Sequence, residues 1–244
     1  MEKQTKEPGE TITLPDGREL GYLIIGEGNP VFFFHGVPSD RLDALLLKGI
    51  ASSKHLKVIG VDRPGFGLST YAPKRKIRDF AADISYLASN LGIERFALVG
   101  YSGGAHYVTT CAALLAKHIT RAVVLGGYSL PPDISKMPHY ERRDFVLADY
   151  ADIIEVFHQS KTKISIRAVA HELRLMKKGW DVDLSQIPLG LVYIWHGSAD
   201  IQASVSCAYR NSTIIPGAHL KIFENEGHPF WVNHLEELGE LLSL

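Results

Sequence analysis

The sequence lacks the features that mark several large classes of protein. It has only two cysteines, Cys111 and Cys207, far apart among small or apolar residues. Two buried free thiols are therefore expected rather than a disulfide framework. No cysteine and histidine residues cluster at metal-ligand spacing. No run of 18 apolar residues is present, so no membrane span is expected.

An excess of charge of either sign is also missing. The chain has 26 basic and 27 acidic side chains and a net charge of −1, which argues against nucleic acid or an anionic membrane as a partner. The first eight residues are polar and of mixed charge, without the apolar segment of a secretory signal, so a cytoplasmic location is expected. At 244 residues, the chain can form one large α/β domain or one domain with an insertion.

The chain does contain a regular alternation of strand and helix patterns. A turn at Pro15-Asp16-Gly17 indicates an N-terminal hairpin, and short apolar runs then alternate with helical periods. This order predicts an α/β fold with a mostly parallel sheet of about eight strands and helices on both faces. The expected strands cover residues 11–14, 19–25, 30–34, 57–61, 96–99, 121–125, 191–195 and 219–223.

The alternation stops after the sixth strand, at Tyr128. Residues 129–188 contain no convincing strand, and helical periods run from Val146 to Phe157 and from Ile166 to Met176. We therefore expect a core of residues 1–128 and 189–244, with a helical cap inserted at 129–188. A basic tract in this insertion is interpreted as a solvated helix face.

The strongest local motif is Gly100-Tyr-Ser-Gly-Gly104, which lies between an apolar strand and a helical pattern. It matches the G-x-S-x-G nucleophile elbow, a sharp turn in which residues without Cβ relieve crowding of the backbone. The helix that follows presents N–H groups and favours negative charge. The pattern predicts Ser102 as a nucleophile.

Two further residues stand just beyond later strands, Asp200 and His228. The carboxyl ends of parallel strands meet at the edge where ligands bind. A serine hydroxyl needs a base within hydrogen-bond reach, and an imidazole titrates near neutrality. We therefore predict His228 as the base of Ser102 and Asp200 as the residue that orients its ring.

Four motifs follow one another along nearly the whole chain: His35-Gly36, Asp62-x-Pro-Gly-x-Gly-x-Ser69, the elbow, and Gly197-x-x-Asp200 followed by Gly227-His228. With this set, the sequence resembles the α/β-hydrolase-fold superfamily of serine hydrolases with a helical cap. The resemblance implies that the backbone N–H groups of Val37 and Gly103 form an oxyanion hole.

Other residues compete for these roles. Asp133 follows the sixth strand, where some members of the fold carry the acid, although Asp200 directly follows a strand and a turn. His234 falls within the pattern of the last helix rather than in a loop. Four polar residues near the strand ends are expected to have structural roles: His35, His196, Asp62 and Arg63.

The expected function is hydrolysis of a small to medium carboxylic ester, or of an amide or thioester, through an acyl-enzyme on Ser102. This is a carboxylesterase-like activity on a small-molecule acyl substrate, and it implies no metal and no organic cofactor. One alternative is an acyltransferase or a cofactor-free perhydrolase that uses the same triad. Another is a receptor-like member of the fold that binds a ligand with little turnover. The sequence leaves open whether the protein is a monomer or a dimer.

Overall fold

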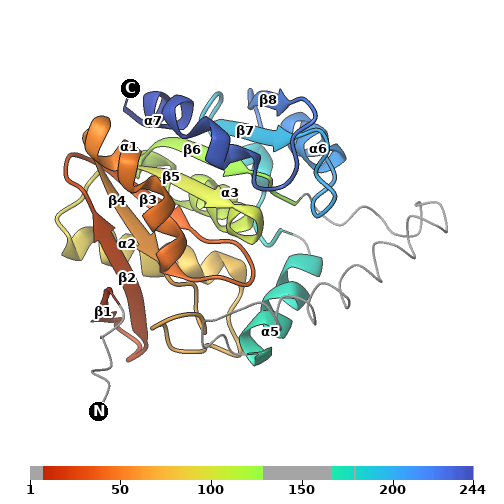
Figure 1. Ribbon diagram of the computed structural model, residues 1–244. Helices are drawn as coiled ribbons and strands as arrows, with labels where there is room; N and C mark the ends of the chain where they lie inside the picture. The colour runs from red at the N-terminus through yellow and green to blue at the C-terminus, as the bar shows by residue number, and fades with distance from the viewer. Residues whose placement is uncertain (1–7, 129–165, 179, 244) are drawn as a thin grey trace, which may run out of the picture.

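An eight-stranded sheet forms the centre of the protein (Figure 1). The computed structural model describes residues 8–128, 166–178 and 180–243. The strand order is β1-β2-β4-β3-β5-β6-β7-β8; β1 and β2 are antiparallel, and the sheet is parallel from β4 onward. This confirms the predicted sheet. The strands are β1 (Glu10–Thr13), β2 (Glu19–Ile25), β3 (Asn29–Phe34), β4 (Leu56–Val61), β5 (Phe96–Tyr101), β6 (Ile119–Leu125), β7 (Val192–Gly197) and β8 (His219–Phe223).

The apolar run of β3 shows why these segments form central strands. Four residues in succession, Val31 to Phe34, are completely buried. Because side chains alternate along a strand, Phe32 and Phe34 enter one hydrophobic core and Val31 and Phe33 enter the other. A strand buried on both faces needs helices on both sides of the sheet.

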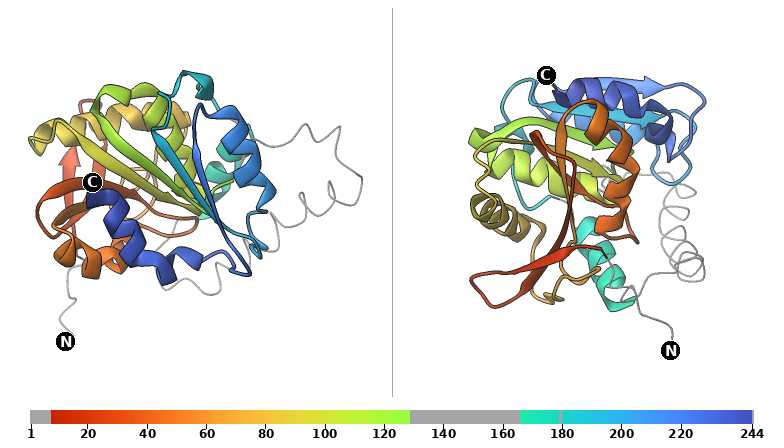
Figure 2. Two further views of the ribbon diagram at one scale, coloured as in Figure 1. Left: turned by 90° about the horizontal axis from the view of Figure 1, so that it is seen from above. Right: turned by 60° about the vertical axis from the view of Figure 1, so that its left-hand side comes forward.

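The helices supply that cover in two layers (Figure 2). One face packs against α1 (Lys48–Ser53) and α7 (Leu235–Ser243), which also contact each other. The other face packs against α2 (Phe80–Asn90), α3 (Ala105–Leu114) and α6 (Ser206–Ile214). None of the described helices is long and apolar enough to cross a membrane.

Two local expectations differ from the structure. The helical segment expected to start near Ser39 begins as the 3-10 turn η1 (Arg41–Leu47), with Asp40 as its N-cap. The extended backbone of Asp40 lets its carboxylate accept the Leu42 N–H at 2.8 Å, while the Ser39 hydroxyl donates to Asp43 instead. Neither cysteine forms a disulfide, as expected, but only one of the two is fully buried.

The second helix expected in the cap is present as α5 (Ile166–Lys177). It lies apart from the two helical layers (Figure 1), and its Ala168 and Val169 pack on Phe66, in the loop after β4. A short 3-10 turn, η6 (Leu184–Gln186), then leads towards β7. The first expected cap helix, residues 146–157, and the greater part of the insertion lie outside the described residues.

The turn from β5 into α3 lies directly against the end of β3. A Cβ atom added to Gly104 would be 2.1 Å from the carbonyl oxygen of Phe34 and 2.9 Å from that of His35. Both atoms belong to the backbone of a central strand or its exit, so they cannot move aside cheaply. Glycine is therefore required at this position for steric reasons.

We predict that Gly104→Ala lowers the free energy of unfolding by about 3 kcal/mol, the upper range for overpacking. The matched control is Gly49→Ala, in α1, where an added Cβ meets nothing within 4 Å. Alanine is the better helix former, so this control is expected to be neutral or more stable by up to about 1 kcal/mol. Urea unfolding of both variants tests the prediction, and equal stabilities would contradict it.

Candidate active site

Ser102 occupies the apex of the turn between β5 and α3. It has a φ of 52°, in the left-handed region that only a few non-glycine residues adopt. Such a conformation costs about 1 to 3 kcal/mol and is found mainly at functional sites. The side chain is largely buried, and a 3-10 turn, η3 (Ser102–Gly104), opens α3 directly behind it. The local structure is the elbow that the sequence predicts.

Asp200 and His228 are in direct contact. The Nδ1 atom of His228 lies 2.6 Å from Oδ2 of Asp200, and both side chains are buried. The other carboxylate oxygen of Asp200 accepts the backbone N–H groups of Gln202 and Ala203, each at 2.9 Å. Because the two residues follow the neighbouring strands β7 and β8, the sheet itself brings them together.

A second histidine reaches the same carboxylate. Nε2 of His196 is 2.7 Å from the carbonyl oxygen of Ala203 and 3.3 Å from Oδ2 of Asp200, so this nitrogen carries a proton. Burial raises the pKa of Asp200, but its bonds to His196 and His228 outweigh burial and hold the pKa well below its usual range. Asp200 is therefore ionised at neutral pH. The sequence predicts His196 only as a structural histidine, and its pattern gives no sign of the contact with Asp200.

The ring of His228 lies beside the elbow. Its centroid is 4.9 Å from that of Tyr101, the residue before Ser102. Gly126 directly follows β6, the strand between β5 and β7. Its lack of a side chain leaves room for the His228 ring, since an added Cβ would lie 3.3 Å from Nδ1 of His228 and 3.6 Å from Oδ2 of Asp200. The three residues predicted as catalytic thus gather at the carboxyl end of the sheet.

The two residues expected to bind an oxyanion are also adjacent. A Cβ atom on Gly103 would lie 2.6 Å from Cγ2 of Val37, so the elbow and the turn after β3 touch at this point. An added Cβ on Gly36 would lie 3.5 Å from Cβ of Ser102. We call residues 35–37 the oxyanion turn, after the role that the resemblance implies for Val37. The turn lies beside Ser102, where an oxyanion hole would have to be.

The oxyanion turn is held by buried polar contacts. The backbone N–H of Arg63 donates to Nε2 of His35 at 3.2 Å, and Nδ1 of His35 lies 2.8 Å from the carbonyl oxygen of Gly36. Burial and then the nearby Arg63 charge lower the pKa of His35 well below its usual value, so the ring is neutral. His35 therefore makes backbone contacts, as the sequence predicts.

Asp62 fastens the loop that follows β4. Its carboxylate accepts the backbone N–H of Arg41 at 2.6 Å and that of Leu68 at 2.8 Å, and it pairs with the Arg41 guanidinium at 3.0 Å. Both partners of this pair are fully buried. These contacts fit the bracing role expected for Asp62.

One acid that the sequence analysis did not single out lies at the junction of α5 with the core. Glu172 is completely buried and forms ion pairs with Arg63 and Arg75. It also accepts the Tyr107 hydroxyl at 2.9 Å, and that hydroxyl accepts a bond from Arg75 at 2.6 Å. A signal was present in the sequence, because Glu172 falls in helical phase with the buried residues of α5: Ala168, Val169, Leu175 and Met176.

The charge of Glu172 depends on these partners. Burial raises its pKa, but the charges of Arg63 and Arg75 outweigh burial and hold the pKa below its usual value. The side chain is therefore an ionised carboxylate at neutral pH. It links α5 to two loops of the core by charge, in addition to the apolar contact of α5 with Phe66.

The rival residues do not join this group where the structure describes them. His234 bonds to Glu226 at 2.5 Å and packs on the ring of Phe223. Asp133 lies outside the described residues. Among the residues that are described, no group of three or more His, Cys, Asp or Glu side chains is arranged to hold a metal ion.

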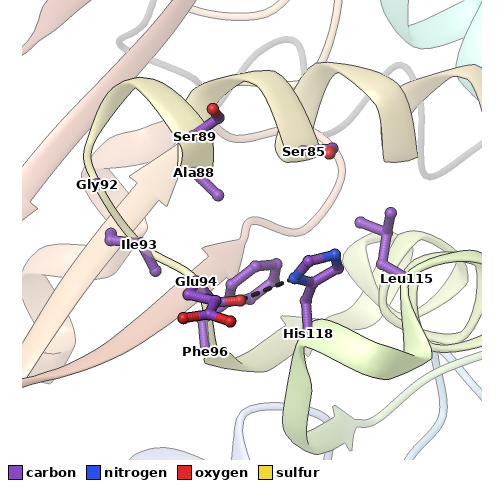
Figure 3. A pocket seen from close by; sticks show the side chains of 9 residues that line it. All are labelled: Ser85, Ala88, Ser89, Gly92, Ile93, Glu94, Phe96, Leu115 and His118. Carbon is purple, nitrogen blue, oxygen red and sulfur yellow. Dashed lines mark hydrogen bonds between the residues drawn. The ribbon is translucent and has the colours of Figure 1, made fainter.

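A hollow of about 390 Å³ lies at the opposite end of β5 (Figure 3). Its lining includes Phe96, the first residue of that strand, and His118, whose Nδ1 is 2.8 Å from the carbonyl oxygen of Glu94. Given the rise of a strand, Phe96 is about 20 Å from Ser102. Ligands of parallel sheets bind at the carboxyl ends of the strands, so this hollow is not part of the candidate site.

Three features define the class of this protein as α/β. They are a mostly parallel sheet, a serine at a strand–helix elbow, and an aspartate–histidine pair after later strands. The chain belongs to the family of the alpha/beta hydrolase fold, whose sequence model matches residues 29–164. The matched residues include the oxyanion turn and the elbow. The match places the protein among the α/β hydrolases.

Individual relatives agree with this assignment. A non-heme haloperoxidase of Rhodococcus erythropolis is 34% identical over 125 residues, 50% of this chain and 44% of the relative. The (E)-2-((N-methylformamido)methylene)succinate hydrolase of Acinetobacter baylyi is 30% identical over 119 residues, 48% and 45% of the two chains. The matches thus span less than half the length of either curated relative. An esterase from Exiguobacterium antarcticum has a similar structure, with a TM-score of 0.76, 21% identity and coverage of 96% and 97%, a likeness of fold alone.

We predict that Glu172→Gln destabilises the protein by about 3 to 5 kcal/mol at pH 7, since it leaves Arg63 and Arg75 without their buried counter-charge. The folded-state pKa of Glu172 is below its unfolded value. Its stabilisation is therefore complete above the unfolded pKa and is lost as the pH falls towards the folded pKa. The difference between parent and variant should shrink at acidic pH.

Urea unfolding at pH 7 and near pH 3.5 measures this difference. The control is Glu237→Gln, which removes the exposed pair with Lys221; surface pairs contribute little, so this variant should unfold like the parent. A penalty for Glu172→Gln that is the same at both pH values would contradict the prediction.

Proposed function

We propose that the protein is a serine esterase that hydrolyses small to medium carboxylic esters through an acyl-enzyme on Ser102. The observation that carries the proposal is the 2.6 Å contact between Asp200 and His228, placed beside the elbow whose apex is Ser102. An esterase among the structural neighbours and a hydrolase among the curated relatives are consistent with it.

In this mechanism, His228 takes the proton of the Ser102 hydroxyl while the oxygen attacks the ester carbonyl. In the tetrahedral intermediate, the negatively charged oxygen accepts hydrogen bonds from the backbone N–H groups of Val37 and Gly103. His228 then gives the proton to the departing alcohol, which leaves an acyl-serine. Water attacks this acyl group with His228 again as base, and the carboxylic acid and free Ser102 are formed.

Asp200 acts through His228. Its carboxylate accepts from Nδ1, so that Nε2 is the nitrogen left to accept the serine proton. The negative charge of Asp200, maintained by its low pKa, stabilises the imidazolium that forms in each half of the reaction. The two backbone N–H groups on its other oxygen prevent the carboxylate from rotating away.

A second candidate function is acyl transfer to hydrogen peroxide, because two curated relatives are named haloperoxidases. The same acyl-serine would then react with peroxide instead of water and release a peracid. The chemistry of Ser102, His228 and Asp200 is unchanged, and only the acceptor differs.

We predict that the parent protein hydrolyses p-nitrophenyl esters of short acyl chains and that Ser102→Ala lowers kcat by at least about 10³-fold. Ser89→Ala, at an exposed position in α2, is the control and should keep kcat within about twofold. A fluorophosphonate probe should label Ser102 alone. Retained hydrolysis by Ser102→Ala, or labelling at another serine, would exclude the mechanism.

Acceptor preference separates the two functions. With an acyl ester and hydrogen peroxide in the same assay, we expect release of the carboxylic acid to exceed formation of the peracid. Both products can be quantified by chromatography in the parent and in Ser102→Ala. Peracid as the main product at millimolar peroxide would make the perhydrolase the function.

A further inference from the structure

Arg63 stands between the cap helix α5 and the oxyanion turn. Its Nη2 donates to the carbonyl oxygen of Gly36 at 2.8 Å, and its Nη1 pairs with Glu172. Nη1 also lies 3.4 Å from the position of a Cβ on Gly103. The guanidinium is completely buried, and these distances place it against both the oxyanion turn and Gly103.

The bond to Gly36 has a geometric consequence for Val37. The carbonyl of Gly36 and the N–H of Val37 belong to one peptide unit, which is planar, so the two groups cannot rotate independently. Any donor that fixes the direction of the Gly36 carbonyl also fixes the direction of the Val37 N–H. Nδ1 of His35 lies 2.8 Å from the same carbonyl oxygen. Arg63 and His35 together therefore determine where one of the two proposed oxyanion donors points.

Glu172 in turn fixes Arg63. The aromatic rings of Phe66 and Tyr107 pack on the guanidinium at 5.0 and 5.1 Å, but neither ring restrains it within its plane. The carboxylate of Glu172 supplies that restraint through Nη1 and neutralises a charge that would otherwise be buried without its counter-ion. Glu172 is also held by Arg75 and Tyr107, so its position does not depend on Arg63 alone.

We propose that Glu172 is a positioning residue of the esterase, which acts through Arg63 to aim the Val37 N–H at the oxyanion. This inference rests on the proposed function. It assigns to the cap helix α5 a part in the chemical step that does not involve contact with the substrate. A merely structural Glu172 would affect stability and leave the turnover of the folded protein unchanged.

The test compares Glu172→Gln and Arg63→Lys with the parent on p-nitrophenyl esters. A lysine keeps a charge near Glu172 but lacks the planar fork needed to bond Glu172 and Gly36 together. A misplaced donor weakens binding of the transition state more than binding of the ester. We expect kcat to fall by about 10- to 100-fold in both variants, with KM changed by less than about threefold.

The matched control is Asp83→Asn. Asp83 is a buried carboxylate that holds Arg18 through two hydrogen bonds, at 2.7 and 3.0 Å, in α2. Its loss disturbs a comparable ion pair that does not touch the oxyanion turn, so kcat should stay within about twofold. All variants are assayed below their unfolding temperatures, and if Glu172→Gln does not fold, Arg63→Lys alone decides the result.

A second measurement uses an alkyl trifluoromethyl ketone, which forms an oxyanion on Ser102. Its inhibition constant should rise in Glu172→Gln and Arg63→Lys in proportion to the loss of kcat/KM. If Ser102→Ala is inactive while both variants keep the kcat and the inhibitor affinity of Asp83→Asn, only the role of Glu172 is overturned. If Ser102→Ala retains hydrolysis, the proposed function fails and this inference fails with it.

Discussion

The arrangement of the site depends on one steric constraint, the approach of the elbow backbone to the end of β3. Gly104 lies so close to the carbonyl of Phe34 that no side chain fits between them. This approach brings Gly103 against Val37 and Gly36 against Ser102. The nucleophile and the Gly103 N–H are thus fixed by the packing of two central strands, and the turn that carries Val37 lies directly against them. Such close packing can maintain a serine with positive φ.

Residues whose places at the candidate site follow from local pattern could be predicted from the sequence. Ser102 is marked by its glycines, and Asp200 and His228 by their places after apolar strands. The sheet order then brings these ends together, since parallel strands share one functional edge. Contacts between distant segments could not be predicted from the local sequence pattern. The bond of His196 to Asp200 depends on how the chain turns after β7, and Asp40 rather than Ser39 caps η1 because of its backbone conformation.

Glu172 illustrates a different limit. Its position on the buried face of α5 can be recognised from helical period, but its partners Arg63 and Arg75 come from loops about a hundred residues earlier in the chain. An isolated acid on an apolar face predicts only that some cation must meet it. Which cation does so is a property of the tertiary fold. Two basic residues near it in sequence, Arg167 and Arg174, are exposed and do not supply that charge.

Two buried carboxylates, Asp200 and Glu172, keep their charge for the same physical reason. Each lies where burial favours the neutral acid, and each has enough donors to reverse that preference. On the proposed mechanism, the two carboxylates support groups of opposite charge. Asp200 stabilises the positive imidazolium of His228. Glu172 holds Arg63, which directs a donor at the negative oxyanion. The two oxyanion donors then differ in origin. The Gly103 N–H is fixed by the elbow within the core, whereas on our proposal the direction of the Val37 N–H also depends on Glu172, a carboxylate of α5. Substitutions at the junction of α5 with the core could therefore alter turnover without touching the substrate.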